Sequence, residues 1–217
     1  LKLLEPAEMS FKAGQFVQFE VPPYELTDEP VYRAYSIASA PSDKNSLQLE
    51  IRLVPNGICT TYVHKYVKTG DRITINGPYG DFYLRDTGLD IIFMAGGSGM
   101  APIRSILFDM AEKGNERRAH YFFGARTQRD LFLVDEMREF ETKLPGFTFV
   151  PAISCPDSDD SCDSETGRNT EVFNRMLGRC ENTEAYLCGS PGMIESSIEV
   201  LTAKGVPEEL IYYDKFA

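Results

Sequence analysis

The 217-residue sequence has few of the residues that build metal centres and acid–base sites. It contains two histidines and five cysteines. The cysteines lack the paired spacing of zinc sites and the spacing of iron–sulfur clusters, so we expect no metal site. Their odd number favours free thiols in a reducing, cytoplasmic setting, with a disulfide between Cys155 and Cys162 left open.

Long apolar runs and positive charge are also scarce. No stretch approaches the roughly 20 apolar residues of a membrane-spanning helix. The chain carries 22 Lys and Arg against 33 Asp and Glu, a net charge of −11. This balance argues against a nucleic-acid partner, because such proteins gather basic residues on one face. Any basic groups must therefore act locally.

The first 86 residues have the rhythm of short strands. Alternating runs at residues 16–20, 47–53 and 72–76 predict half-buried strands with turns between them. Closely spaced strands of this kind favour an antiparallel β-barrel. We predict a barrel domain over residues 1–86.

Residues 87–217 alternate between apolar runs and amphipathic segments. Strands are predicted at 91–95, 120–123, 147–153, 185–188 and 210–213, and helices after residue 100 and at 135–142, 171–177 and 193–204. This alternation indicates a doubly wound parallel sheet. The acidic segment 155–165 is predicted to be a solvated surface loop.

A glycine-rich turn joins the first of these strands to its helix. The turn contains Gly96, Gly97, Ser98, Gly99 and Met100. Glycines permit close backbone approach, and a helix N-terminus presents free N–H groups to a pyrophosphate. A tight turn without a ligand is the alternative, and the spacing is not that of an ordinary Rossmann dehydrogenase.

Three further segments combine groups suited to cofactors. Arg33, Ala34, Tyr35 and Ser36 place a guanidinium, an aromatic ring and a hydroxyl on one extended run. A second turn begins a short helix and contains Gly57, Ile58, Cys59, Thr60 and Thr61. Its threonines either cap the backbone N–H groups of that helix, or the same N–H groups hold a phosphate. Cys188 and Gly189 end a predicted strand, and Phe216 follows near the C-terminus. Each segment taken singly also fits a purely structural role.

Together, RAYS, GICTTY, GPYGDF, AGGSGMAP, FGART and CGSPGM resemble the ferredoxin–NADP reductase superfamily, and they span nearly the whole chain. DEPVYRAYSIA, GGSGMAPIRS and YYDKFA are most similar to the FAD and NADH module of the flavin-bearing subunit of sodium-pumping NADH:quinone oxidoreductase. The resemblance implies a barrel that binds FAD, followed by a nucleotide-binding domain.

The resemblance also implies residue roles. Arg33 would contact the flavin phosphates, Tyr35 would pack on the isoalloxazine ring and Ser36 would lie near flavin N5. The turn from Gly57 to Thr61 would hold the FAD pyrophosphate. Gly96, Gly97 and Gly99 would face the dinucleotide pyrophosphate, Cys188 would lie near the nicotinamide, and Phe216 would cover the other flavin face.

Hydride would then pass from NADH to FAD. The reduced FAD would pass its electrons singly to a [2Fe–2S] domain, a ferredoxin or another acceptor absent from this sequence. Arg126, Arg129 and Asp130 are expected to read the ribose: Arg126 or Arg129 favours the 2′-phosphate of NADPH and Asp130 a 2′-hydroxyl. The subfamily resemblance favours NADH.

Two features depart from the family. Residues 1–14 are too short for the usual first barrel strand, so we expect a missing N-terminal portion. The sequence also contains no cysteine set for a [2Fe–2S] domain and no N-terminal membrane anchor, so we expect any membrane contact to come through missing segments or partner subunits. Rival functions are a redox-sensing subunit that binds FAD without turnover, an NADPH-specific ferredoxin reductase and a flavin-free dehydrogenase.

Overall fold

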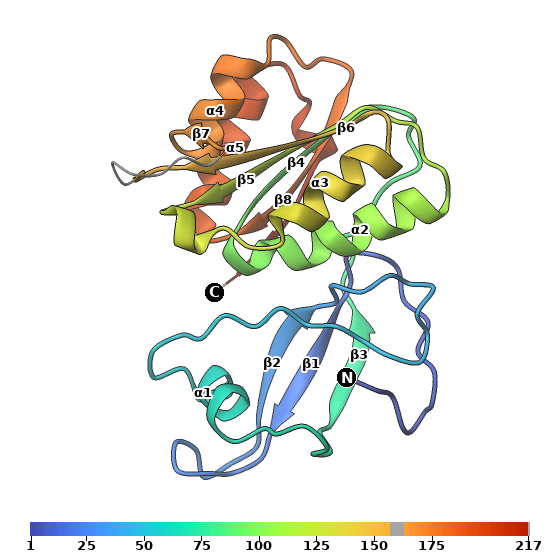
Figure 1. Cartoon of the computed structure of the whole chain (residues 1–217), viewed down its shortest axis with the longest axis vertical. Coiled ribbons are helices and arrows are strands. Elements are labelled where there is room, and N and C mark those ends of the chain that lie inside the picture. Colours follow the sequence, from blue (N-terminus) through green and yellow to red (C-terminus); the bar gives the residue numbers. More distant parts are fainter. Residues whose placement is uncertain (157–162, 217) are drawn as a thin grey trace.

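The computed structural model describes residues 1–156 and 163–216, arranged as two stacked regions (Figure 1). The middle of the acidic segment and Cys162 lie outside the described residues. Among the helices of the described part, none is long and apolar enough to cross a membrane.

The first region is built on a three-stranded antiparallel sheet. Its strands are β1 (Phe16–Val21), β2 (Val31–Ser36) and β3 (Ile75–Tyr79), in the order β2-β1-β3. Isolated bridges, such as Lys2 to Ser46 and Ile37 to Leu49, lie outside these strands. Helix α1 (Ile58–Lys65) lies beside the sheet (Figure 1). The alternate residues of β1 are buried, as the period-two pattern predicts.

The strand predicted at residues 47–53 is wrong. This segment makes a single bridge, from Leu49 to Ile37, and continues as irregular backbone. Backbone groups of Leu1 and Ala38 bond Leu47 and Gln48 at 2.8 Å. Beyond them, side chains take part: the His64 ring bonds the Ile51 carbonyl at 3.0 Å, and the Thr60 hydroxyl bonds the Val54 backbone at 3.2 Å. The backbone polar groups are thus satisfied without a ladder. The strand predicted at 72–76 begins later, at Ile75.

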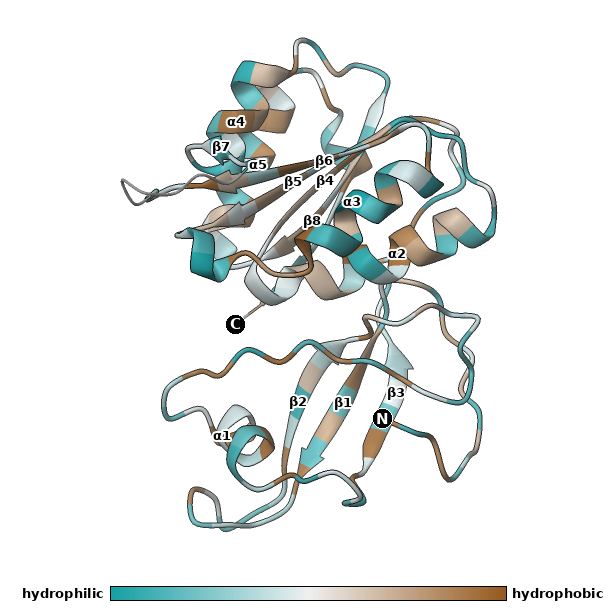
Figure 2. Cartoon of the chain, viewed as in Figure 1, coloured by the Kyte–Doolittle hydropathy of each residue, from teal (hydrophilic) through white to brown (hydrophobic). Residues whose placement is uncertain are grey.

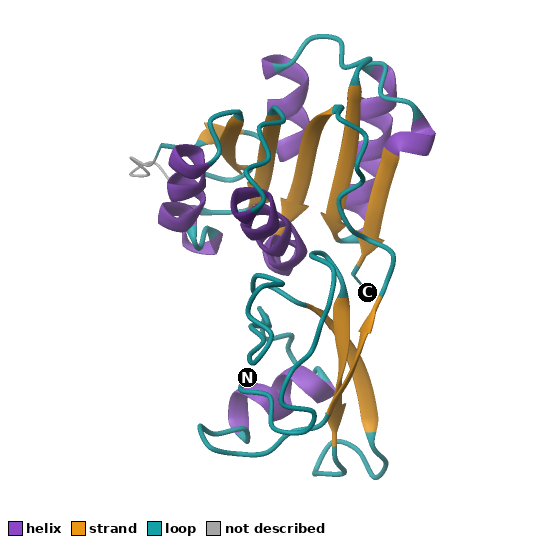
Figure 3. Ribbon diagram, turned by 90° about the vertical axis from the view of Figure 1, so that its right-hand side faces the viewer, coloured by secondary structure: helices purple, strands orange, loops and turns teal. Residues whose placement is uncertain are grey.

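The second region contains a six-stranded parallel sheet, flanked by helices (Figure 3). Its strands are β4 (Asp90–Gly96), β5 (Ala119–Ala125), β6 (Phe147–Ile153), β7 (Glu165–Thr166), β8 (Thr183–Gly189) and β9 (Ile211–Lys215). They lie in the order β7-β6-β5-β4-β8-β9. The five predicted apolar runs are confirmed as strands, and β7 is an addition.

Helices cover both faces of this sheet. They are α2 (Met100–Glu112), α3 (Val134–Lys143), α4 (Asn169–Met176) and α5 (Pro191–Ala203), with single 3₁₀ turns at Gly97–Gly99, Gln128–Asp130 and Glu208–Leu210. Ile91 and Phe93 of β4 pack with α2 and α3, whereas Ile92 and Met94 pack with α4 and α5. Burial on both faces explains why the central strand β4 is a nearly continuous apolar run. Figure 2 shows the hydropathy of the strands and of the helices around them.

The fold class predicted from the sequence is confirmed: an antiparallel β region precedes a doubly wound parallel sheet, although the described part of the predicted barrel forms a three-stranded sheet with isolated bridges. The chain proceeds from β4 through β5 to β6, then returns to place β8 on the other side of β4. Strand order therefore reverses between β4 and β8. Ligands of open parallel sheets bind beyond the carboxyl ends of the strands at this point.

Candidate cofactor-binding cleft

A cleft of about 1640 Å³ opens between the two regions, at this reversal of strand order. Gly96 at the end of β4 and Gly189 at the end of β8 both line it, and Arg33 to Ser36 line it from β2. The volume exceeds the roughly 300–1000 Å³ of a typical small-molecule pocket, so the cleft has room for more than one small ligand.

Most of the residues proposed from the sequence meet in this cleft. They are Arg33, Ala34, Tyr35, Ser36, Gly57, Ile58, Cys59, Thr60, Gly96, Gly97, Ser98, Arg126, Asp130, Gly189 and Phe216. They come from segments far apart in the sequence, which the two sheets bring to one surface. Arg129, the other arginine considered for ribose recognition, is not among the lining residues.

Four proposed residues are not on the cleft wall: Thr61, Gly99, Met100 and Cys188. A Cβ at Gly99 would lie 2.1 Å from the Cys188 carbonyl oxygen, so this glycine lets α2 pack against β8. The Cys188 side chain is fully buried in the core, and burial raises the pKa of its thiol well above the ordinary value. Met100 accepts a hydrogen bond from the Tyr121 hydroxyl at 3.3 Å in the same core.

The turn before α1 differs from the expected hydroxyl clamp. Gly57 is the N-cap of the helix, and no side chain caps it. The Thr60 hydroxyl bonds the backbone of Val54 at 3.2 Å, so it stabilises the preceding segment. The first backbone N–H groups of α1 are the groups that remain to meet an anion.

Tyr35 and Cys59 form the apolar corner of the first region's wall. The Tyr35 ring meets Phe19 edge-on, with ring centroids 6.4 Å apart. Burial raises the pKa of the Tyr35 hydroxyl, and the adjacent Cys59 thiol adds to this shift. The hydroxyl therefore stays protonated at neutral pH.

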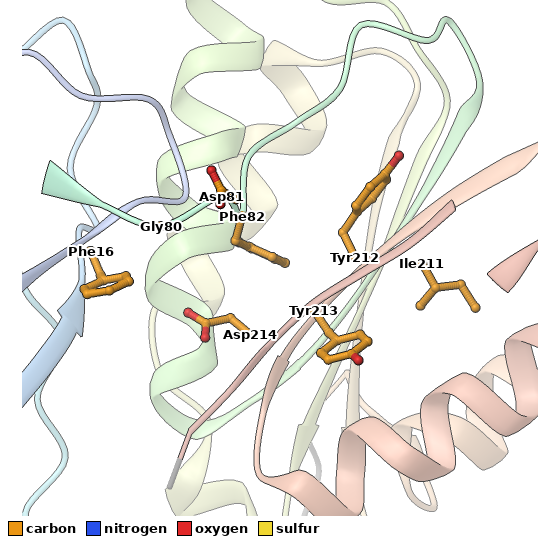
Figure 4. A pocket seen from close by; sticks show the side chains of 8 residues that line it. All are labelled: Phe16, Gly80, Asp81, Phe82, Ile211, Tyr212, Tyr213 and Asp214. Atoms are coloured by element: carbon orange, nitrogen blue, oxygen red, sulfur yellow. The ribbon is translucent and has the colours of Figure 1, made fainter. Parts of the chain in front are cut away.

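The end of β9 forms another part of the cleft wall. The Phe216 amide donates to the Gly189 carbonyl at 2.8 Å, which holds this aromatic residue at the wall. Asp214, two residues earlier, also lines the cleft, and burial raises the pKa of its carboxyl. Figure 4 shows Asp214 beside Phe16 in an adjoining hollow of about 320 Å³ at the junction of the two regions.

Within the described part of the chain, the cleft gathers arginines that lack carboxylate partners. Arg33, Arg52, Arg126 and Arg168 all line it and are exposed. Within residues 1–156 and 163–216, no carboxylate forms an ion pair with any of them. In a chain with a net charge of −11, such a group of arginines without ion-pair partners favours an anionic ligand.

Asp130 stands among these arginines on the wall of the second region. The Thr127 hydroxyl and amide each donate to its carboxylate at 2.9 Å. These bonds, with the charges of Arg126 and Arg52, lower the pKa of Asp130. A fixed carboxylate accepts a hydrogen bond from a hydroxyl and repels a phosphate.

Sequence reasoning did not select Arg52, Arg168, Asp214 or Glu50, which also line the cleft. Of these residues, Arg168 is the one that the sequence pattern comes nearest to identifying as a binding residue, because it precedes a predicted helix that follows a parallel strand. Arg52 and Glu50 lie on the segment misread as a regular strand. Asp214 gives no signal beyond its closeness to Phe216.

Two family models match the chain. An oxidoreductase FAD-binding domain matches residues 1–83, and an oxidoreductase NAD-binding domain matches residues 93–198. The residues of the first match form the cleft wall that contains Tyr35. The residues of the second match form the wall that contains the glycine-rich turn.

Curated relatives align along the whole chain. The reductase component of propane 2-monooxygenase from Rhodococcus jostii is 37% identical over 217 residues, covering 98% of this chain and 57% of that protein. A subunit of the Na(+)-translocating NADH-quinone reductase from Neisseria meningitidis is 33% identical over 256 residues, covering 100% of this chain and 63% of that protein. The chain thus spans about three fifths of the curated relatives it matches.

Solved structures give the same result. The Amycolatopsis reductase GcoB superposes with a TM-score of 0.87 at 28% identity, covering 96% of this chain and 62% of that one. A ferredoxin NADP+ reductase from Neisseria gonorrhoeae with bound FAD and NADP shares the fold, with a TM-score of 0.74 at 22% identity and coverage of 95% and 87%. The resemblance to the flavin-bearing quinone-reductase subunit is therefore shared with oxygenase reductases, and the chain belongs to the ferredoxin–NADP reductase superfamily of FAD- and NAD-binding oxidoreductases.

Proposed function

We propose that this chain binds FAD and NADH side by side in the cleft, receives hydride from NADH and passes electrons singly to a one-electron acceptor. The observation that carries the proposal is the set of four arginines without carboxylate partners in the described, acidic chain. Two dinucleotides would bring two pyrophosphates to these guanidinium groups.

The helix N-termini support the same proposal. Neither α1 nor α2 nor α5 has a side-chain cap, and residues at or beside all three N-termini line the cleft. Uncapped N–H groups and the positive end of the helix dipole favour phosphate. Gly97, with φ of 55°, and Gly192, with open space around its missing Cβ, leave the backbone accessible there.

We assign the flavin half of the cleft to the first region. Arg33 and the uncapped turn at Gly57 would hold the phosphates, Tyr35 would support the ring, and the Ser36 hydroxyl would bond its polar edge. Bound FAD would supply the ability to accept two electrons together and release them singly. The protein's part is mainly to hold two planar rings in contact and exclude water.

The dinucleotide half is assigned to the second region. Gly96, Gly97 and Ser98 would carry the pyrophosphate, and Phe216 would lie where nicotinamide must enter. Cys188 and Gly99 would not contact the dinucleotide. They would support the cleft wall through the packing of β8 against α2. The fixed carboxylate of Asp130 supports NADH over NADPH, since it would repel a 2′-phosphate.

The acceptor is proposed as a [2Fe–2S] domain or ferredoxin, at the cytoplasmic side of a membrane or free of it. This part rests on relatives named as reductase components and as a quinone-reductase subunit. We likewise propose a domain boundary between residues 86 and 87, close to the interval between the two matched families.

Anaerobic titration tests the function directly. The purified chain should take up FAD and turn yellow, and NADH should bleach the flavin band faster than NADPH. Arg33→Ala should weaken FAD binding by about tenfold, as expected for one charged hydrogen bond. Arg179→Ala, which removes an exposed arginine paired with Glu181, is the control and should bind FAD normally.

Three results would reject parts of the proposal. A chain that takes up no FAD is not a flavoprotein, and one whose bound FAD is not reduced by NADH is a sensor at most. Asp130→Ala should improve the use of NADPH relative to NADH by several-fold, and an unchanged ratio would remove Asp130 from ribose recognition.

A further inference from the structure

Arg104 of α2 is a buried arginine that spans the junction of the two regions. Its Nη1 donates to the Ala38 carbonyl at 3.1 Å and to Gln48 Oε1 at 2.7 Å, both in the first region. Its Nη2 donates to Glu136 Oε2 of α3 at 2.9 Å, and its Nε also bonds Glu136. A single guanidinium thus joins three segments that are distant in sequence.

The charge of Arg104 is balanced within this junction. Glu136 binds the guanidinium through both carboxylate oxygens, in the two-pronged geometry that arginine favours. Glu50 lies 4.0 Å from the Arg104 Nε, beyond hydrogen-bonding distance, and both its oxygens are buried. A lysine has no planar fork to reach all these acceptors at once.

The segments that Arg104 joins carry the two halves of the cleft. Ala38 lies two residues beyond Ser36, and Gln48 lies two residues before Glu50, both lining residues of the first region. Arg104 itself lies on the second turn of α2, directly after the glycine-rich turn. The neighbouring Ser105 hydroxyl adds a bond to the Ser39 carbonyl at 2.7 Å.

We propose that Arg104 is a positioning residue, which sets the separation of the flavin and dinucleotide halves of the cleft by joining β2 and the 48–50 segment to α2. The inference rests on the proposed function, because ring contact matters only if both cofactors bind. When a reaction depends on holding two reactants in contact, displacing one of them by about 1 Å can lower the reaction rate by up to a hundredfold.

The experiment uses Arg104→Met, the milder Gln48→Ala, which removes one of the acceptors, and Arg138→Met as a matched control. Arg138 is a half-buried arginine of α3, and its bonds to Glu141, Phe149 and Asp163 all lie within the second region. Amide hydrogen exchange is measured on the cofactor-free chain, and flavin reduction by NADH on the FAD-loaded chain.

Arg104→Met should speed exchange in peptides covering residues 36–50 and slow flavin reduction by about 10- to 100-fold. The dissociation constant for FAD and the half-saturating NADH concentration should stay within about threefold of the parent, because no proposed cofactor contact is removed. Gln48→Ala should change both readouts in the same direction and by less. Arg138→Met should speed exchange only in α3 and β6 and leave the reduction rate unchanged.

Parent-like exchange over residues 36–50, or a parent-like reduction rate, in Arg104→Met would overturn the proposal. If Arg104→Met fails to fold, the same two readouts on Gln48→Ala decide it. Failure of the proposed function is distinguishable, since the parent itself would then show no flavin reduction while the exchange data still report on the junction.

Discussion

The two walls of the cleft are supported by unequal amounts of structure. The dinucleotide wall rests on a six-stranded sheet with large apolar clusters on both faces. The flavin wall rests on a three-stranded sheet and two small clusters, one around Val17, Ile37 and Leu47 and the other around Phe19, Val21 and Cys59. Since buried apolar area is the main source of stability, the second region is the rigid platform.

The difference implies that the flavin wall depends on what it touches. Its segment 47–54 is irregular and is held by side chains of Thr60, His64 and Arg104. Regions with few buried contacts open locally at low free-energy cost. A bound ligand or a neighbouring domain can supply the missing stabilisation.

The largest expected effect is a loss of stability when one atom is added to the tightly packed second region. Gly99→Ala would place a Cβ 2.1 Å from the Cys188 carbonyl oxygen, which belongs to backbone and cannot swing away. We expect a loss of about 3 kcal/mol in the free energy of unfolding. Urea unfolding followed by circular dichroism measures it.

Gly178→Ala is the matched control, because no atom lies within 4 Å of its missing Cβ. It should leave the stability of the chain nearly unchanged. Equal stabilities for the two variants would show that α2 can move away from β8, and the platform would then be less rigid than its packing suggests.

The next effect tests the dependence of the flavin wall on its ligand. FAD at 100 times its dissociation constant should stabilise the folded chain by about 2.7 kcal/mol. Hydrogen exchange should slow mainly in residues 16–65. Riboflavin, which lacks the phosphates that Arg33 would bind, should protect the same residues less. Equal protection of both regions by FAD would contradict the comparison.

The smallest effect concerns the junction between the walls and depends on pH. Burial raises the pKa of Glu50 to about 7; the positive charge of Arg104 opposes this shift and the negative charge of Glu136 adds to it. The unfolded carboxyl ionises near 4.5. The folded state therefore holds the extra proton between these values, and the stabilisation from Glu50 is full below pH 4.5 and lost as pH rises to about 7.

Glu50→Gln removes this titration. The stability of the parent relative to this variant should fall by at most about 1.4 kcal/mol for each pH unit between pH 5 and 7, and then level off. Urea unfolding at pH 5, 6, 7 and 8 measures it, with Glu199→Gln on an exposed face of α5 as control. A difference that is constant from pH 5 to 7 would remove Glu50 as a titrating group of the junction.

Sequence patterns predicted the platform well and the flavin wall less well. Parallel strands buried on both faces, such as Ile91 to Ala95, are continuous apolar runs, and their short length and flanking turn residues identify them as strands. Residues 47–53 alternate like a strand, yet the structure gives them one bridge, scattered backbone bonds to Leu1 and Ala38, and a bond from the His64 ring of α1 to the Ile51 carbonyl. Such contacts between distant segments leave no local pattern.

The same limit applies to the cleft. Its glycines and the Arg33–Ser36 run were recognisable because turns and phosphate contacts have local signatures. Arg52 and Arg168 are ordinary surface residues in the sequence, and they become cleft residues only when the sheets bring them together. Gly99 shows the converse: it belongs to a recognisable motif, and the fold uses it for packing against β8.

The arginines of the cleft stand in a molecule whose net charge is −11, and this has a consequence for kinetics. An approaching dinucleotide is repelled at long range by the protein's overall field and attracted only within the last several ångströms. Salt screens charges beyond about 8 Å at physiological ionic strength, so added salt should speed encounter while it weakens retention. Association and dissociation of the coenzyme should therefore both accelerate as ionic strength rises.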